Sequence, residues 1–465
     1  MMKIKINNAP MGALLLIAVM AISGSCKKFL DKKSNTSLVE PTTLNDLQEL
    51  LDDGVKMNSA ATPSYGEVSA DDYFVTPTTF TNLSMQDQQY YSWQPVEQLG
   101  SGNDWGVCYE KVYNSNYCLD QLKNISVNAQ NLSMWDNVKG SALFFRSYYF
   151  LELLGDYAKA YDSATASRDL GIALRLSSDF NIPSVRASVV RCYQEVIQDT
   201  KQAAALLPPY GANELRPSKM TAYGLLARTY LRTGIYDEAL LYADSCLQLN
   251  HHLINFNGDE DIKTSITAKL PFKQFNKETI FYTEMNKNGG LQRTDLKSRI
   301  DTVLYRSYAT NDLRKAAFFS INADGYPYFK GSYSTSLSTL FSGIATDEML
   351  LTRAECFVRV GQIQKGVTDL NNLLMMRYKT GSFIPYTISS QKSALDTILL
   401  ERRKELVMRG LRWTDLKRLN KEGASITIKR TTLSNNFTLF PNANFYALPI
   451  PSNIIQITGM PQNPE

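Results

Sequence analysis

Histidine is nearly absent from the sequence, and its scarcity removes several kinds of site. The 465 residues include only two histidines, His251 and His252, which are adjacent. A zinc site with three histidine ligands is therefore excluded, and catalytic triads that use histidine as the base are disfavoured. We interpret the pair as an exposed loop or the end of a helix.

Cysteine is also scarce, and the spacing of the cysteines indicates neither a disulfide framework nor a zinc site. The six cysteines include no Cys-x-x-Cys pair, and five remain when Cys26, discussed below, is set aside. This odd number disfavours a zinc ribbon or a disulfide scaffold, although one isolated disulfide stays open. We expect Cys246 and Cys356 to pack between helices as small hydrophobic side chains.

A large charge of one sign is missing as well. Lys and Arg number 49 against 45 Asp and Glu, which leaves a formal net charge of +4. So small an excess predicts no strong electrostatic field for nucleic acid. The composition is otherwise that of a globular protein, with 44% hydrophobic and 20% charged residues.

The chain shows no convincing motif for a cofactor or a metal ion. Gly100 to Trp105 begins like a dinucleotide-binding loop but lacks the third glycine, so we interpret it as a turn before a helix capped by Asn103 or Asp104. Asp71-Asp72 and Asp259-Glu260-Asp261 lack the alternating spacing of a calcium loop, and we interpret both as solvated loops. We predict no cofactor, no metal ion and no catalytic residue.

Aromatic residues, by contrast, are plentiful. The chain has 26 tyrosines, 20 phenylalanines and 4 tryptophans. Phe144 with Tyr148 and Phe145 with Tyr149 are i, i+4 neighbours, so we expect these rings to pack against other helices. Other rings lie in segments whose Pro, Gly, Asn, Ser and Thr residues break helical periodicity. Rings carried by loops on a rigid frame are the candidates for binding.

The first 25 residues resemble an export signal. Two lysines precede an apolar run from Met11 to Ile22, which is too short to span a bilayer. Ser23-Gly24-Ser25 then precede Cys26, which resembles the lipobox of bacterial lipoproteins, where the cysteine is lipidated and becomes the mature N-terminus. We predict a lipoprotein signal peptide over residues 1–25 and lipidation of Cys26. Ordinary secretion with cleavage nearby is the alternative.

Two segments have the spacing of tetratricopeptide repeats. They run from Leu226 to Cys246 and from Ala354 to Leu373, with small residues where the two helices of a 34-residue hairpin approach closely. A third match around Leu151 to Ala160 is interrupted, and its second helix resumes at Ser184 to Leu207. The sequence therefore predicts an all-α fold, a tetratricopeptide-like scaffold of helical hairpins with long irregular loop insertions. The insertions are Leu38 to Gly106, His251 to Asn311 and Asp324 to Phe341.

A basic segment from Glu401 to Glu422 carries eight Lys and Arg residues against four acids. Leu399, Leu406 and Trp413 recur every seven residues, and the acids lie three or four positions from several arginines. We interpret the segment as one packed structural helix with paired charges, and Trp413 as a core residue.

Five stretches, in this order, resemble the SusD/RagB family of outer-membrane nutrient-binding lipoproteins, the starch-utilisation-system D-like proteins. They are Cys26 to Asp31, Trp105 to Leu122, Arg216 to Leu249, Ile398 to Leu419, and the tail Tyr446 to Pro451 with Gln462-Asn463-Pro464. The resemblance divides the chain into the signal peptide 1–25, an N-terminal region 26–250 with tetratricopeptide-type helices, and a C-terminal region 251–465 with insertions and a closing helix.

The resemblance implies a binding protein rather than an enzyme. It implies a lipid anchor, palmitate included, at Cys26, in the outer membrane and on the cell surface. It also implies a SusC-like TonB-dependent transporter as the partner, with this chain as its lid. The implied ligand is an oligosaccharide, or a peptide as in the RagB branch, and nucleic acid is not a partner.

We expect the ligand to bind the loops around Tyr65 to Trp93 and Tyr305 to Tyr333. Sugars need flat rings for their apolar faces, and amides, carboxylates or arginines for their hydroxyls. The candidate ligand-binding rings are Tyr90, Trp93, Tyr326 and Tyr328. Two other functions stay open: a tetratricopeptide adaptor that binds a protein partner, and a surface glycosidase, which needs two carboxyl groups across a cleft.

Overall fold

Helical hairpins form the frame of the protein, as the repeat spacing predicts. The computed structural model describes residues 41–96, 103–263, 265–291, 297–432 and 435–464, so the predictions for the signal peptide and for Cys26 lie outside the described residues. Leu44–Glu465 form one compact unit. The two predicted repeats are the pairs α11 (Lys219–Thr233) with α12 (Tyr236–Leu249) and α15 (Thr346–Arg359) with α16 (Ile363–Met375).

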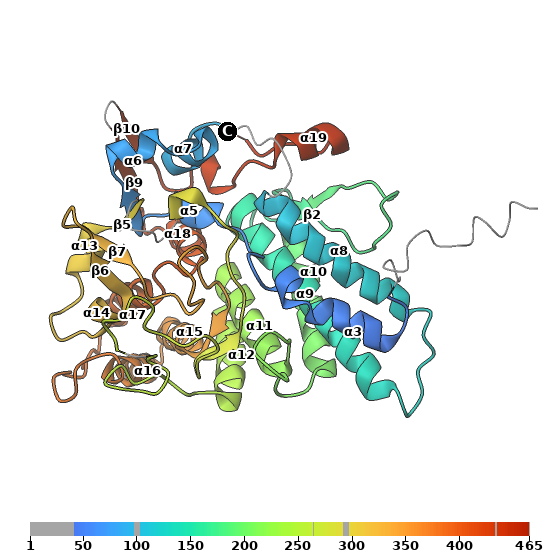
Figure 1. Cartoon of the computed structure of the whole chain (residues 1–465), viewed down its shortest axis with the longest axis horizontal. Helices are drawn as coiled ribbons and strands as arrows, with labels where there is room; N and C mark the ends of the chain where they lie inside the picture. Colours follow the sequence, from blue (N-terminus) through green and yellow to red (C-terminus); the bar gives the residue numbers. More distant parts are fainter. Residues whose placement is uncertain (1–40, 97–102, 264, 292–296, 433–434, 465) are drawn as a thin grey trace, which may run out of the picture. The chain divides into compact units, whose positions relative to one another are not determined.

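These pairs belong to one continuous array of packed helices, which Figure 1 shows crossing the unit. On one side α10 (Val189–Leu206) packs on α11 and on α9 (Leu132–Tyr157), which in turn packs on α8 (Asp104–Leu122). On the other side α12 packs on α15, and α17 (Gln391–Glu405) packs on α15 and α16. The all-α, tetratricopeptide-like class is therefore confirmed.

Local signals explain why these hairpins form where the sequence predicts. Ser218 caps α11, because its hydroxyl accepts the N–H of Thr221 at 3.2 Å while the Thr221 hydroxyl accepts the N–H of Ser218 at 2.7 Å. Gly234 ends α11 at φ +74°, a left-handed conformation that glycine adopts at little cost. In the second repeat, a Cβ added to Gly366 would lie 2.5 Å from the Ala354 carbonyl oxygen, so α15 and α16 approach as closely as predicted.

The interrupted third repeat is built from α9 and α10. The chain between them contains a short antiparallel ladder of β2 (Leu170–Ala173) and β3 (Arg186–Ser188). At the start of α8, the Asn103 side chain accepts the N–H of Gly106 at 2.8 Å, which confirms the predicted helix cap.

The first insertion is more regular than predicted, because it contains several short helices, some of them with N-terminal caps. Thr76 caps α6 ahead of Pro77 at its first turn, and Ser84 caps α7. The elements of this insertion are α3 (Leu44–Asp52), α4 (Gly54–Met57), α5 (Tyr65–Ser69), β1 (Tyr73–Val75), α6 (Pro77–Thr81) and α7 (Met85–Ser92).

The later segments contain short helices and strands as well. Each of these strands forms an antiparallel pair with one other strand, and one pair includes β1 of the first insertion. β1 pairs with β5, β4 with β8, β6 with β7, and β9 with β10. The bounds are β4 (Thr279–Phe281), η1 (Gly289–Leu291), β5 (Ser298–Ile300), α13 (Thr302–Arg306), α14 (Arg314–Phe318), β6 (Phe319–Ile321), β7 (Pro327–Phe329), β8 (Ile344–Ala345), α18 (Arg412–Lys421), β9 (Ile428–Thr431), β10 (Asn436–Leu439), η2 (Asn444–Tyr446) and α19 (Ser452–Thr458).

The rings at helical spacing on α9 lie in the core, as predicted. Phe144, Phe145, Tyr148 and Tyr149 have no exposed surface. Phe281 on β4 packs edge-on against Phe144, with ring centroids 4.8 Å apart. These aromatic contacts join the insertion that carries β4 to the helical frame.

The basic segment from Glu401 to Glu422 is not one helix, which corrects the prediction. α17 ends at Glu405 and α18 begins at Arg412, and between them Met408 and Gly410 have φ values of +59° and +74°. Left-handed residues cannot continue a right-handed helix, so the seven-residue spacing of Leu399, Leu406 and Trp413 does not trace one face. Trp413 is nevertheless buried in the core, as predicted.

Among the described residues, every helix is too short or too polar to cross a bilayer.

Candidate ligand-binding site

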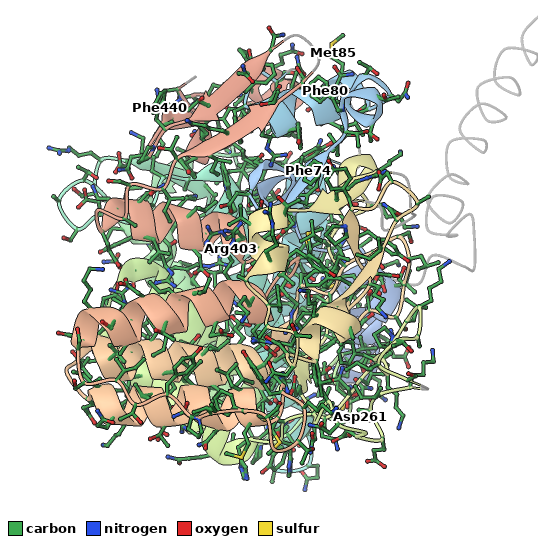
Figure 2. All side chains as sticks on the ribbon, turned by 90° about the vertical axis from the view of Figure 1, so that its left-hand side faces the viewer. Phe74, Phe80, Met85, Asp261, Arg403 and Phe440 are labelled. Carbon is green, nitrogen blue, oxygen red and sulfur yellow. The ribbon has the colours of Figure 1, made fainter. Side chains whose placement is uncertain are left out.

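The first insertion and strands from much later in the sequence meet on one side of the unit. β1 pairs with β5 so that Phe74 lies opposite Arg299, and the β6–β7 hairpin packs on β5. Figure 1 shows these strands on the left of the view, with β9, β10, α6 and α7 above them. In Figure 2 this side faces the viewer, with Phe80 above Phe74 and Arg403 below it. The two loops expected to bind ligand therefore do share a surface.

Two rings from different insertions contact each other on this surface. Phe74 on β1 and Tyr326 in the turn between β6 and β7 have ring centroids 5.2 Å apart and ring planes at 84°. Tyr326 is 41% exposed. The Asp324 carboxylate holds the turn in place, since it accepts the N–H of Tyr326 at 3.2 Å and Nη2 of Arg299 at 2.6 Å. The pair presents aromatic surface to solvent on a fixed turn.

A groove of about 250 Å³ borders Phe74 and lies between the β1 and β9 segments. It combines aromatic rings with charged groups and hydroxyls, which is the mixture that a hydroxyl-rich ligand requires. The lining residues are Asp71, Tyr73, Phe74, Val75, Tyr91, Asp301, Ile428, Lys429, Arg430 and Thr431.

Ion pairs from the interrupted basic segment support the floor of this groove. Asp71 accepts Nε of Arg412 at 2.6 Å, and Asp72 accepts Nε of Arg403 at 2.8 Å. Burial alone would raise the pKa of Asp71, but the charges of Arg412 and Arg403 lower it well below its ordinary value. Asp71 therefore stays ionised. The two aspartates are paired and largely buried, which corrects their interpretation as a solvated loop.

Glu67 on α5 lies buried behind this floor. Burial, together with the nearby charge of Asp72, raises its pKa from 4.5 to about 8. Its Oε2 accepts the backbone N–H of Gly410 at 3.0 Å. The break between α17 and α18 thus contacts α5 directly, and the Glu67 carboxyl is protonated at neutral pH.

Arg430 on β9 lies within a group of aromatic rings. Its guanidinium carbon is 3.6 Å from the ring centroid of Tyr91 and 5.2 Å from those of Tyr73 and Trp93. Nη2 of Arg430 donates to the carbonyl oxygen of Val68 at 3.0 Å and also to that of Ala70. These contacts fix β9 against the first insertion, so the groove has a stable wall.

The four predicted ring residues lie in three different environments. Tyr326 and Tyr328 are on the β6–β7 hairpin, the first exposed and the second half-buried. Tyr90 has no exposed surface and stacks on Tyr65, with centroids 3.8 Å apart. Trp93 is 8% exposed and lines a separate cavity beside β10. The ligand role of these rings stays a prediction.

Two features of the site were not singled out from sequence. Phe74 belongs to the aromatic-rich first insertion, but its neighbour Tyr73 is equally aromatic, and only strand alternation separates the buried ring from the half-buried one. The contribution of β9 had no sequence signal, because Lys429 and Arg430 lie far beyond both predicted loops.

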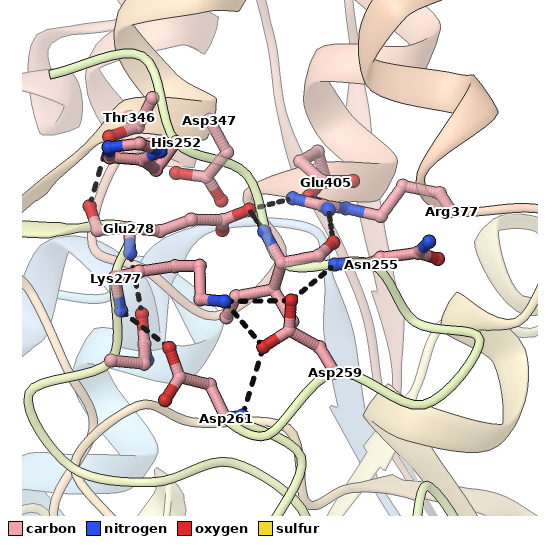
Figure 3. Close-up of polar contacts among 12 residues, drawn as sticks. His252, Asn255, Asp259, Asp261, Lys277, Glu278, Thr346, Asp347, Arg377 and Glu405 are labelled. Carbon is pink, nitrogen blue, oxygen red and sulfur yellow. Dashed lines mark hydrogen bonds and ion pairs between the residues drawn. The ribbon is translucent and has the colours of Figure 1, made fainter.

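The second acidic run is also engaged by the protein itself. Asp259 forms an ion pair with Nζ of Lys277 at 2.7 Å, and Asp261 accepts the backbone N–H of Lys277 at 2.8 Å, contacts drawn in Figure 3. Asp261 is buried, so the interpretation of this run as a solvated loop holds only in part. Within the part of the chain that the structure describes, no group of three or more acidic, histidine or cysteine side chains is placed to hold a metal ion.

A fully buried ion network lies next to this run. Arg377 donates from Nε to Glu405 at 2.7 Å and from Nη2 to Glu278 at 2.7 Å, and the three side chains have no exposed surface (Figure 3). The network joins the second insertion to α17 and lies inside the protein, so we interpret it as structural.

The cysteines that the structure describes are buried, whereas the two histidines are exposed. Cys108, Cys118, Cys192, Cys246 and Cys356 are all buried and unpaired with one another. Burial raises the pKa of the Cys192 thiol to about 11, which disfavours the nucleophilic thiolate. His251 and His252 are exposed after the end of α12, as expected.

Two protein-family models together match most of the chain. Residues 28–231 match a SusD-like family model described as "Starch-binding associating with outer membrane", and residues 254–465 match the model of the SusD family. No curated protein sequence matches the chain.

Solved structures share the fold at low sequence identity. A SusD superfamily protein from Bacteroides thetaiotaomicron is 19% identical, with a TM-score of 0.73 over 91% of this chain and 100% of that chain. A SusD-like carbohydrate binding protein from Bacteroides vulgatus is 19% identical, with a TM-score of 0.66 over 90% of this chain and 97% of that chain. These likenesses show that the fold is shared.

Proposed function

Because the chain belongs to the SusD/RagB family, we propose that it binds oligosaccharides in the groove beside Phe74. The contact between Phe74 and Tyr326 supports this proposal most. It joins two insertions into one partly exposed aromatic surface at the border of a groove that also carries charges and hydroxyls. Tyr328, half-buried on the same hairpin, extends the proposed surface.

The chemistry of the groove suits a hydrated polymer. The edge and face of the two rings can cover the apolar faces of sugar residues, while Asp301, Lys429 and Thr431 lie along the groove for hydroxyl groups. Tyr90 is left out of the proposed surface, because its ring is wholly covered by other residues. Catalysis is not part of the proposal, since the groove offers binding groups without an activated nucleophile.

We further propose that the protein is a cell-surface lipoprotein, anchored in the outer membrane through Cys26. It would deliver the bound oligosaccharide to a SusC-like TonB-dependent transporter and act as its lid. The lipobox-like sequence supports the anchor. The family model that matches the N-terminal region is one of proteins that associate with the outer membrane, which supports the location.

A glycan array probed with residues 27–465 tests the proposed ligand class, and incubation of each bound glycan with the protein tests for hydrolysis. We expect retention of one class of oligosaccharide with no release of shorter products. Product release would favour the glycosidase alternative. Binding of peptides but of no glycan would favour a peptide carrier. Co-purification of the full chain with an outer-membrane barrel, rather than with a soluble protein, separates the transporter lid from a tetratricopeptide adaptor.

A further inference from the structure

A second cavity, of about 340 Å³, lies beside β10, whereas the groove lies beside β9. Three rings contribute to its wall, namely Trp93, Phe437 and Phe445. Gln94, Thr438 and Asn444 add uncharged polar groups, and all three residues are exposed at the surface. The cavity is therefore open to solvent and combines aromatic with amide and hydroxyl groups.

The two cavities differ sharply in charge. The groove is lined by two aspartates, a lysine and an arginine, whereas no ionisable side chain of the described residues lines the cavity beside β10. A charged ligand group would lose its hydration there without gaining an opposite charge, which is unfavourable. An uncharged group with hydroxyls and apolar faces would meet partners for both of its parts.

Trp93, which lines this cavity, has an unusual backbone conformation. Trp93 ends α7 in the left-handed region, at φ 56° and ψ 40°, which large side chains rarely adopt. Glycine or asparagine is the common residue at such a helix end. Trp93 keeps the conformation because its Nε1 donates to the carbonyl oxygen of Ser69 at 3.0 Å and because the Arg430 guanidinium lies over its ring. Strained residues of this kind concentrate at functional sites.

We propose that the cavity beside β10 is a second binding site, for an uncharged sugar residue of a neutral oligosaccharide. Phe437, Phe445 and the edge of Trp93 would contact the apolar faces of the sugar, and Gln94, Thr438 and Asn444 its hydroxyls. This inference rests on the proposed function, because it takes the same ligand class. It adds a site that binds independently of the groove.

Two variants separate the sites. Phe74→Ala with Tyr326→Ala removes the ring surface of the groove and leaves the β10 cavity unchanged. Thr438→Arg introduces a long, charged side chain at an exposed strand position on the wall of the cavity, so no buried contact is lost. Thr78→Arg, at an exposed position on α6 outside both cavities, is the matched control.

Saturation-transfer NMR with maltotetraose, cellotetraose, xylotetraose, mannotetraose and tetragalacturonate provides the test. A neutral tetrasaccharide that binds the unaltered protein should still bind the groove variant. Adding Thr438→Arg to the groove variant should weaken that remaining binding about tenfold or more, the effect of losing a set of polar and ring contacts. Adding Thr78→Arg should leave it unchanged.

The proposal is overturned if the groove variant loses all binding, if Thr438→Arg leaves the remaining binding intact, or if tetragalacturonate binds the groove variant better than the neutral sugars. In each of these cases the unaltered protein still binds sugar, so the proposed function survives. Failure of the folded, unaltered protein to bind any glycan contradicts both proposals. Thermal unfolding of every variant shows whether the fold is intact.

Discussion

The carboxylate of Asp72, directly before β1, accepts a hydrogen bond from Nε of Arg403 at 2.8 Å, across 331 positions of the chain. Asp72 is 1% exposed, whereas the Arg403 side chain is 19% exposed. The last turn of α17 is thereby joined to the segment that carries Phe74. The pairing therefore ties the start of β1 to α17.

Arg403→Ala should lower the free energy of unfolding by about 3 kcal/mol, because it leaves a buried carboxylate without its main partner. Urea denaturation followed by circular dichroism measures the change. Arg403→Lys, which keeps the charge but not the forked geometry, should cost less. A loss below about 0.5 kcal/mol for Arg403→Ala would place this pair among ordinary surface ion pairs.

Glu67→Gln should make the protein more tolerant of alkaline pH. The pKa of Glu67 in the folded protein, about 8, lies above its ordinary value of 4.5. The stability that goes with a protonated Glu67 is therefore fully present below pH 4.5 and is lost as the pH rises through 8. Glutamine cannot ionise, and its amide oxygen can still accept the N–H of Gly410.

The thermal midpoint of Glu67→Gln minus that of the unaltered protein should therefore increase as the pH is raised from about 5 to about 8.5. Buried Asp156 and Asp347 have raised pKa values as well, of about 7 each, but they are present in both proteins and cancel in the comparison. A constant difference across this range contradicts a buried, titrating Glu67.

The mature chain should contain five free thiols. In denaturant and without reductant, a thiol reagent should count all five cysteines that follow Cys26, and in the native protein they should react slowly because each is buried. A count of three or one in denaturant reveals a disulfide that the structure does not contain. Fast reaction of the native protein would mean that the helical array opens readily.

Cys26→Ala should abolish incorporation of labelled palmitate in a Gram-negative host and release the protein from the membrane fraction. Acyl chains supply the membrane affinity in such an anchor, at about 0.8 kcal/mol per buried methylene group. Cys108→Ala, at a buried position, is the control and should leave labelling unchanged. Palmitate labelling that persists in Cys26→Ala would contradict lipidation at Cys26.

Local patterns made the helical frame predictable. Small residues at repeat spacing located α11, α12, α15 and α16, because helix contacts within a hairpin involve residues close in the sequence. The Asn103 cap and the buried rings on α9 followed from equally local rules. The family resemblance rested on some of these segments, Trp105 to Leu122 and Arg216 to Leu249, and on other short stretches outside the repeats.

The site could be predicted only in outline, because its contacts are long-range. Asp71 and Asp72 resemble a solvated acidic pair until Arg403 and Arg412 are brought to them by the break after α17. That break was missed because charges three or four positions apart suggest pairing within one helix, and the left-handed backbone at Met408 gives no such signal. Burial of Tyr90 likewise depends on Phe445, which lies far away in the sequence.

The most direct test of glycan binding at the groove is affinity electrophoresis, or calorimetry, of Phe74→Ala with Tyr326→Ala against the glycan that the array identifies. Tyr210→Ala, at an exposed tyrosine outside the groove, is the matched control. The double variant should fall at least tenfold in affinity, as expected from losing two ring contacts, with an unchanged thermal midpoint. Unchanged affinity in the folded double variant, or an equal loss in Tyr210→Ala, would contradict the assignment of the groove as the ligand site.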